Sequence, residues 1–163
     1  DQSIRVAGDD FTLDIVEYIK RQHNILIGER TAEQVKIHVG SALQDLESPP
    51  EDFAVHGRDL LTGIPKQVTV AYSEIAGCLD KSISKIEEAI MKALESTPPE
   101  LASDIYRKGI YLTGGGALLR GLDKRIAMKT KLPVKVADDP LRAVVRGTGI
   151  ALKNRHRYTF LMS

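Results

Sequence analysis

The stretch that decides the fold is Gly109-Ile110-Tyr111-Leu112-Thr113-Gly114-Gly115-Gly116-Ala117-Leu118-Leu119. Its apolar run 110–112 predicts a short strand buried on both faces, and apolar residues at 118, 122 and 126 then follow helical spacing. The glycines 114–116 lie where the period changes. Because glycine has no Cβ, they can adopt positive φ and let the backbone approach a ligand closely. We interpret the stretch as a ligand-binding strand-to-helix turn. The alternative is a tight turn without a ligand.

Length and composition restrict the class of protein. With 163 residues, 42% of them hydrophobic, the chain can bury one core, with room for a small insertion. The net charge of +1 gives no electrostatic case for nucleic acid as a partner. Cys78 is the only cysteine, which excludes an internal disulfide and a multi-cysteine metal site. The histidines lack ligand spacing, so we expect no metal site. No apolar run approaches the roughly 18 residues of a membrane span, so we expect a soluble cytoplasmic protein.

Apolar periodicity predicts a series of helices and strands. Caps and stops place the helices at 8–22, 31–39, 73–97, 100–107 and 139–152, with Thr31, Ser73 and Asp139 as N-caps and Gly40 as a stop. Gly147 and Gly149 in the last helix suggest close helix packing there. Strands are expected at 53–56, 68–72, 110–112 and 134–136, the first two forming a hairpin. Residues 4–6 resemble the end of a strand, so we expect the chain to be a piece of a longer protein.

This order of elements predicts an α/β fold with an insertion. Strands separated by helices of ten or more residues are typical of an α/β sheet flanked by helices. We assign residues 1–23 and 73–163 to this sheet subdomain. Residues 24–72 are expected to form a smaller, inserted α+β subdomain.

Several stretches together resemble the C-terminal half of the MreB family of bacterial actin homologues, within the superfamily of actin, DnaK-type chaperones and sugar kinases. The glycine turn alone indicates only the superfamily, whereas the proline-proline-Glu-Leu-Ala segment and the motif around residue 33 are more specific. The matching stretches are Val6-Ala7-Gly8-Asp9-Asp10-Phe11, Ile27-Gly28-Glu29-Arg30-Thr31-Ala32-Glu33-Gln34-Val35-Lys36, Pro98-Pro99-Glu100-Leu101-Ala102-Ser103-Asp104-Ile105, Leu112-Thr113-Gly114-Gly115-Gly116-Ala117-Leu118-Leu119-Arg120-Gly121-Leu122 and Asp138-Asp139-Pro140-Leu141.

The resemblance implies one half of an actin-like ATPase with a ribonuclease H-like fold, a mixed sheet flanked by helices. The complete protein would bind ATP with Mg²⁺ between two lobes and polymerise head to tail. It would position the cell-wall synthesis machinery and so maintain rod shape. It would be cytoplasmic and membrane-associated, contacting the inner membrane mainly through the half that is absent here. The family's two phosphate loops and its water-activating carboxylate do not occur in this chain, so we assign no catalytic residue and expect no ATP turnover by it alone.

The same resemblance supplies candidate nucleotide-binding residues, which are Glu33, Lys36, Gly114, Gly115, Gly116 and Ala117. Glu33 and Lys36 stand at i and i+3, so they share one helix face, opposite the apolar positions. A carboxylate suits ribose hydroxyls, and a lysine stem can pack along a base. The alternative for this pair is an ordinary solvent-facing ion pair.

Two other functions remain open. The chain could be the C-terminal lobe of a small-molecule kinase of the same superfamily, in which the insertion recognises the substrate. It could also be an interaction module with a disused nucleotide turn. The tail 153–163 places basic residues before apolar ones and could touch an anionic membrane surface, or be a frayed terminus.

Overall fold

The computed structural model describes residues 3–157 of the chain. Its α-helices are α1 (Gly8–His23), α2 (Glu29–Val39), α3 (Tyr72–Glu95), α4 (Pro99–Lys108), α5 (Leu122–Thr130) and α6 (Ala143–Lys153). The 3₁₀ helices are η1 (Gly115–Leu118) and η2 (Arg155–Arg157). The strands are β1 (Ile25–Leu26), β2 (Phe53–Asp59), β3 (Pro65–Val70), β4 (Ile110–Leu112) and β5 (Val134–Val136).

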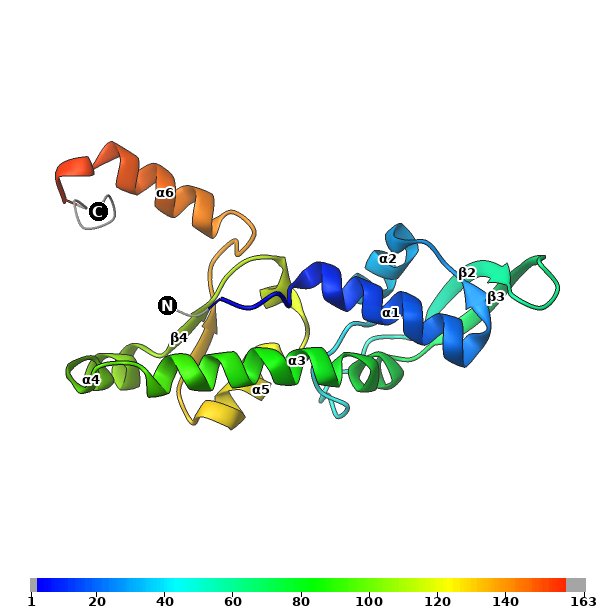
Figure 1. Ribbon diagram of the computed structural model, residues 1–163, viewed down its shortest axis with the longest axis horizontal. Helices are drawn as coiled ribbons and strands as arrows, with labels where there is room; N and C mark the ends of the chain where they lie inside the picture. The colour runs from blue at the N-terminus through cyan, green and yellow to red at the C-terminus, as the bar shows by residue number, and fades with distance from the viewer. Residues whose placement is uncertain (1–2, 158–163) are drawn as a thin grey trace.

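The strands form two separate sheets. One is antiparallel, in the order β1-β2-β3, and in the other β4 pairs with β5 in parallel. Figure 1 shows α3 running along the long axis of the molecule, with the β2–β3 hairpin toward one end and the parallel pair toward the other. The α/β class and the hairpin are confirmed. The first hairpin strand extends to Asp59, and the second ends at Val70 because Tyr72 already begins α3.

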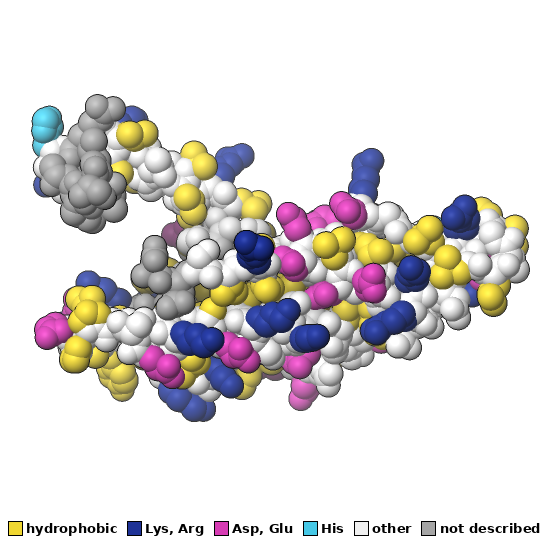
Figure 2. Space-filling view, viewed as in Figure 1, with side chains coloured by type: hydrophobic (Ala, Val, Ile, Leu, Met, Phe, Trp, Pro, Cys, Tyr) yellow, Lys and Arg dark blue, Asp and Glu magenta, His cyan; other side chains and the backbone are white. Residues whose placement is uncertain are grey.

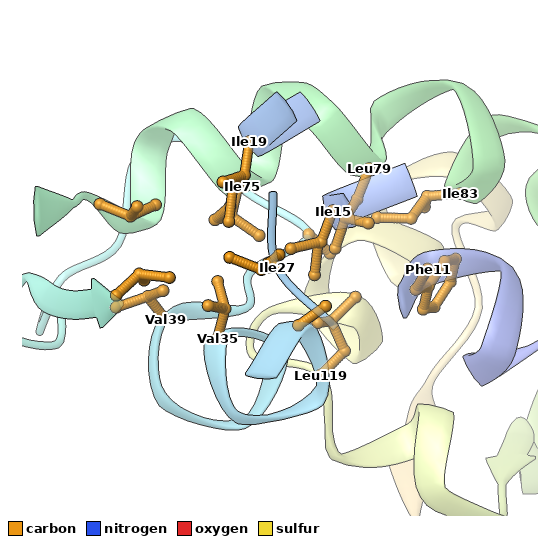
Figure 3. Close-up of a cluster of buried hydrophobic side chains, with 14 of the residues drawn as sticks. Phe11, Ile15, Ile19, Ile27, Val35, Val39, Ile75, Leu79, Ile83 and Leu119 are labelled. Carbon is orange, nitrogen blue, oxygen red and sulfur yellow. The ribbon is translucent and has the colours of Figure 1, made fainter. Parts of the chain in front are cut away.

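The core lies between α1, α2, α3 and the antiparallel sheet (Figure 3). Helix α1 contributes the fourfold-spaced stripe of Phe11, Ile15 and Ile19, all 2% exposed or less. Helix α3 faces it with Ile75, Leu79 and Ile83, and α2 adds Val35 and Val39. The side chains are almost all aliphatic. Their burial holds the three helices in fixed relative positions, and those positions define the candidate site described below.

Three predicted helix starts are wrong. Helix α2 begins after Gly28, whose carbonyl accepts the N–H groups of Thr31 and Ala32, so Thr31 lies inside the first turn. Helix α3 begins after Ala71, whose N–H donates to the Glu74 carboxylate at 3.3 Å. That contact replaces the expected Ser73 cap. Asp139 has φ of 51° and lies in a turn, so α6 begins only at Ala143.

Expectations about strands and burial also need correction. Residues 4–6 form no strand, and Ile4 is 42% exposed, because the described residues place no strand beside them to pair with. Strand β4 is not buried on both faces, since Tyr111 is 59% exposed in a sheet of two strands. Leu118 is also exposed, and its neighbour Leu119 enters the core instead, because the segment after the glycines is a 3₁₀ turn without α-helical spacing.

Helix α6 extends away from the rest of the described structure (Figure 1). None of its residues is buried, and Val144 and Val145 are 63% and 73% exposed. Hydrophobic side chains line it in the space-filling view (Figure 2). A Cβ added at Gly147 or Gly149 would meet no described atom within 4 Å. The close helix packing expected at these glycines is therefore absent within residues 3–157, where no other α-helix packs against α6 at these positions.

Asp59 binds the loop between β2 and β3, and its contacts predict that the free energy of unfolding falls at low pH. Its Oδ1 accepts the N–H groups of Leu61 and Thr62, each at 2.9 Å, and Lys66 Nζ lies 3.1 Å from Oδ2. The Thr62 N–H bond, the Lys66 contact and the Leu61 N–H bond lower the pKa of Asp59 from 3.8 to about 2. A carboxyl whose pKa is lowered by folding stabilises the fold above its unfolded pKa, and that contribution is lost as the pH falls toward the folded value.

We therefore expect Asp59→Asn to reduce the free energy of unfolding at pH 7. The difference from the unsubstituted chain should shrink as the pH falls from about 5 to about 2, where Asp59 itself becomes protonated. Urea denaturation across this pH range measures it. Asp45→Asn, at an exposed carboxylate, is the matched control and should leave stability nearly unchanged. A difference for Asp59→Asn that stays constant with pH would contradict the expectation.

Candidate functional site

The glycine turn connects β4 to η1. Gly114 has φ of +82° and donates its N–H to the Pro140 carbonyl at 2.8 Å. Gly115 and Gly116 have no positive φ, so only Gly114 needs the freedom expected of all three. A Cβ at Gly114 or Gly116 would meet no described atom within 4 Å, whereas one at Gly115 would lie 3.4 Å from Leu141. The turn therefore exposes bare backbone to open space.

Ala117, the last candidate in the turn, points the other way. Its side chain is buried, and its N–H donates to the Gly114 carbonyl at 3.2 Å. The first N–H groups of a helix have no partner inside it, so those of Gly115 and Gly116 are the ones available to a ligand. Ala117 instead fixes η1 against the core.

The residues after the turn attach it to the C-terminal end of α2. The Ala42 N–H donates to the Arg120 carbonyl at 2.8 Å, and the Arg120 guanidinium donates to the Ile37 carbonyl at 3.1 Å. Gly40 ends α2 as expected, and its Cα lies so close to Leu119 that a Cβ would come within 3.0 Å of Leu119 Cδ1. The glycine turn and α2 are therefore held as one unit.

Glu33 and Lys36 form an ion pair on α2, as in the alternative stated for them from the sequence. The pair does not simply face solvent, because it lies against the first turns of α1. Lys36 Nζ also donates to the Gly8 carbonyl at 2.9 Å and to Thr12 Oγ1 at 3.0 Å. The Lys36 side chain is 16% exposed, and that of Glu33 is 44% exposed. Lys36 thus joins two helices, and Glu33 is the more accessible partner.

Thr12 completes this network from α1. Its hydroxyl lies 2.8 Å from Glu33 Oε2 and donates to it. Burial raises the pKa of the Glu33 carboxyl. The hydrogen bonds from Lys36 and Thr12, with the Lys36 charge, more than offset this, so the pKa of Glu33 lies below its ordinary value. Glu33 is therefore a carboxylate at neutral pH and can only accept hydrogen bonds.

A hollow of about 340 Å³ opens beside Glu33, between the N-terminal parts of α1 and α2. Its lining residues are Asp9, Thr12, Leu13, Glu29, Arg30 and Glu33. Three carboxylates face one guanidinium there, which disfavours a phosphate and favours a neutral group rich in hydroxyl donors. The exposed Leu13 side chain offers an apolar surface for a flat ring. The chemistry of this hollow fits a nucleoside better than it fits a free anion.

The structure does not bring all the candidate residues into one pocket. No residue of the glycine turn lines this hollow. From Glu33 to Gly40 the distance along α2 is about 10 Å at 1.5 Å per residue, and the turn is attached near Gly40. A single ligand would have to extend along α2 to reach both places.

Thr12, Asp9 and Glu29 were missed as site residues from sequence alone. From the sequence, Asp9 and Thr12 fall only within the predicted helix 8–22, and neither is a candidate for the site. The contact of Thr12 with Glu33 is tertiary, so no local pattern could reveal it. Cys78 is half-buried, and burial raises the pKa of its thiol to about 12. Within residues 3–157 no cluster of three or more metal-ligating side chains occurs, and no helix there is long and apolar enough to cross a membrane.

Comparisons with known proteins cover nearly the whole chain. The family model described as "MreB/Mbl protein" matches residues 1–159. The cell shape-determining protein Mbl of Bacillus cereus is 46% identical over 155 residues, which are 95% of this chain and 46% of that protein. The cell shape-determining protein MreB of Escherichia coli is 46% identical over 151 residues, 93% of this chain and 43% of that protein. The chain thus spans about half the length of these relatives.

Solved structures agree with this assignment. The crystal structure of MreB5 of Spiroplasma citri bound to ADP superposes with a TM-score of 0.87 at 40% identity, covering 95% of this chain and 47% of that one. A MamK double helical filament, at 22% identity and a TM-score of 0.68 over 85% of this chain and 42% of that one, shares the fold. By the extent of the family match and the identity to these relatives, the chain belongs to the MreB/Mbl family.

Proposed function

We propose that this chain is the C-terminal lobe of an ATP-binding, filament-forming cytoskeletal subunit that determines cell shape. The observation that carries the proposal is the 45–46% identity, over more than nine tenths of the chain, to proteins named as cell shape-determining. Its actin-like fold, shared with a filament-forming protein, is consistent with self-association. The expected division into residues 1–23 with 73–163 and an inserted 24–72 belongs to this proposal.

The nucleotide part rests on the relatives and on the hollow beside Glu33. Two structures of MreB5 are described as bound to ADP and to AMPPNP, and they cover 95% and 98% of this chain. In our proposal the ribose hydroxyls donate to Glu33, while the base lies along α2. The acidic lining of the hollow keeps phosphates out, so the phosphate chain extends toward the bare backbone of Gly114, Gly115 and Gly116. The length of α2 between the two places suits an extended nucleotide.

This chain supplies only part of what ATP hydrolysis needs. Phosphoryl transfer depends on positioned phosphates, a metal ion and an oriented nucleophile. The described residues offer no ligand cluster for Mg²⁺, so Mg²⁺ would be held by the phosphates and by residues outside this chain. We expect this chain alone to release phosphate from Mg-ATP no faster than buffer does.

The exposed apolar side of α6 also supports a larger subunit. Leu141, Val144, Val145 and Leu152 are each at least 58% exposed on or next to this helix. Large exposed apolar surfaces on a soluble protein often mark contacts with another protein surface. We propose that the remainder of the subunit covers α6, that the complete subunits assemble head to tail, and that wall-synthesis proteins and the inner membrane are their partners, with the subunit in the cytoplasm.

The proposal predicts that Glu33→Ala weakens nucleotide binding in the complete subunit. Loss of a hydrogen bond to a charged group should raise the dissociation constant for ATP about tenfold. Binding of a fluorescent ATP analogue, with competition by unlabelled ATP, measures this. The fold should be retained, because the Glu33 side chain is 44% exposed. Circular dichroism of the variant checks this.

Two variants complete this test. Glu88→Ala removes an exposed carboxylate from α3 and should bind ATP like the parent. Gly115→Val should also weaken binding, because it covers the exposed backbone with a branched side chain, and Gly115 has no positive φ that would make the change strained. If Glu33→Ala binds ATP with the same dissociation constant as the parent, Glu33 and Lys36 form only a structural ion pair and the proposed contact is wrong.

A further inference from the structure

The Thr12 hydroxyl lies between the two candidate nucleotide-contact side chains, and the residue is 6% exposed. It has a single proton to donate. Glu33 Oε2 at 2.8 Å is a better acceptor than the Gly8 carbonyl at 3.1 Å, because the carboxylate is both nearer and charged. The lone pairs of the hydroxyl receive Lys36 Nζ at 3.0 Å. Thr12 therefore donates to Glu33 and accepts from Lys36 at once.

Lys36 has no hydrogen left for a ligand in this arrangement. A lysine ammonium carries three donors, and here they face Glu33 Oε2, the Gly8 carbonyl and Thr12 Oγ1. To contact a ligand, Lys36 would have to give up one of these partners. Its 16% exposure, against 44% for Glu33, agrees with an inward position.

Glu33, unlike Lys36, keeps an atom that is available to a ligand. Both its contacts, from Thr12 and from Lys36, fall on Oε2. Among the described residues, no group donates to Oε1. One oxygen is thus anchored from two helices, and the other remains a free acceptor at the edge of the hollow that Glu33 lines.

We propose that Thr12 is a positioning residue, which together with Lys36 anchors one carboxylate oxygen of Glu33 so that the other is presented to a ribose hydroxyl of the nucleotide. Lys36 then acts as a strut between α1 and α2, and Glu33 is the only member of the network that touches the ligand. This inference rests on the proposed nucleotide function. It gives Lys36 a different role from the base contact that the family resemblance implies.

The first experiment needs only this chain and no ligand. NMR titration of the Glu33 side-chain carboxyl carbon reports whether Thr12 holds the carboxylate. The pKa of Glu33 should rise in Thr12→Val, which keeps the shape and removes the hydroxyl, and should stay low in Thr12→Ser. Thr97→Val is the matched control, because the Thr97 hydroxyl donates to the Ala93 carbonyl in the last turn of α3, far along the chain from Glu33. An unchanged titration of Glu33 in Thr12→Val overturns the anchoring role.

The second experiment measures ribose recognition in the complete subunit. The dissociation constants of ATP, 2′-deoxy-ATP and 3′-deoxy-ATP are compared for the parent, Thr12→Val, Thr12→Ser and Lys36→Met. The parent should discriminate against at least one deoxynucleotide by about tenfold, as expected for a site whose acceptor is left unpaired. In Thr12→Val and Lys36→Met this preference should fall to about threefold or less, and Thr12→Ser should restore it.

The outcomes separate the inference from the proposed function. Equal weakening of all three nucleotides in Thr12→Val, with the preference intact, overturns the positioning role and indicates a purely structural one. If Lys36→Met still discriminates between ATP and the deoxynucleotides as the parent does, Lys36 does not act as a strut that positions Glu33. A parent that binds no adenine nucleotide overturns the proposed function and this inference together, whereas the NMR titration still decides the anchoring of Glu33.

Discussion

Gly109→Ala is expected to lower the free energy of unfolding by at least about 3 kcal/mol, since two penalties act at one position. Gly109 has φ of +78°, which side chains rarely adopt. In addition, an added Cβ would lie 2.1 Å from the Pro133 carbonyl oxygen, which is backbone and cannot rotate away. That carbonyl accepts the Ile110 N–H at 2.8 Å, so moving it also weakens the start of the β4–β5 pair. Urea denaturation followed by circular dichroism measures the loss.

Two glycines in the same chain provide matched controls. Gly114 has a similar φ of +82° but open space above it, so Gly114→Ala should incur only the backbone penalty of about 1 to 2 kcal/mol. Gly147 lies inside α6 with neither constraint, and Gly147→Ala should be neutral or stabilising by up to about 1 kcal/mol. If Gly109→Ala destabilises no more than Gly114→Ala does, the close approach of Pro133 is wrong.

Apolar periodicity predicted the helices that bury one face with regularly spaced apolar side chains. The stripe of Phe11, Ile15 and Ile19 gave α1, and the stripe beginning at Ile75 gave α3. Element starts were less predictable, because a start depends on which group accepts or donates the first hydrogen bonds. At α3 that group is the Glu74 carboxylate, three residues inside the helix, and not the hydroxyl of Ser73.

The candidate site was predictable only where it is local. The i, i+3 spacing placed Glu33 and Lys36 on one face of α2, and the ion pair confirms this. The contact of Thr12 with Glu33 spans 21 positions in sequence, so it follows from the packing of α1 on α2 and not from any motif. The same limit explains Leu118 and Leu119. Which of two adjacent leucines is buried depends on the 3₁₀ geometry of η1.

The exposure of α6 and Tyr111 was not predicted either, for a reason that does not involve local geometry. Tyr111 belongs to the apolar run 110–112 that predicts burial, and the last helix was expected to pack closely, yet Tyr111 and Val144 are 59% and 63% exposed. The pattern of apolar residues predicts that a side chain is buried, but it does not predict which other part of the protein buries it. Our proposal assigns the cover of α6 to the remainder of the subunit, which is consistent with relatives about twice as long as this chain.

Leu79→Ala is expected to cost about 3 to 5 kcal/mol, because the Leu79 side chain is fully buried between α1 and α3 (Figure 3). The neighbours Ile15 and Ile83 belong to packed helices, so they can collapse only partly into the cavity. Ile86 lies on the same stripe of α3 but is only partly buried, so Ile86→Ala should cost roughly half as much or less. Thermal and urea denaturation of both variants measure the ratio. Equal losses at the two positions would contradict the partial burial of Ile86. Losses below about 0.5 kcal/mol at both would mean that the core does not lie between these helices.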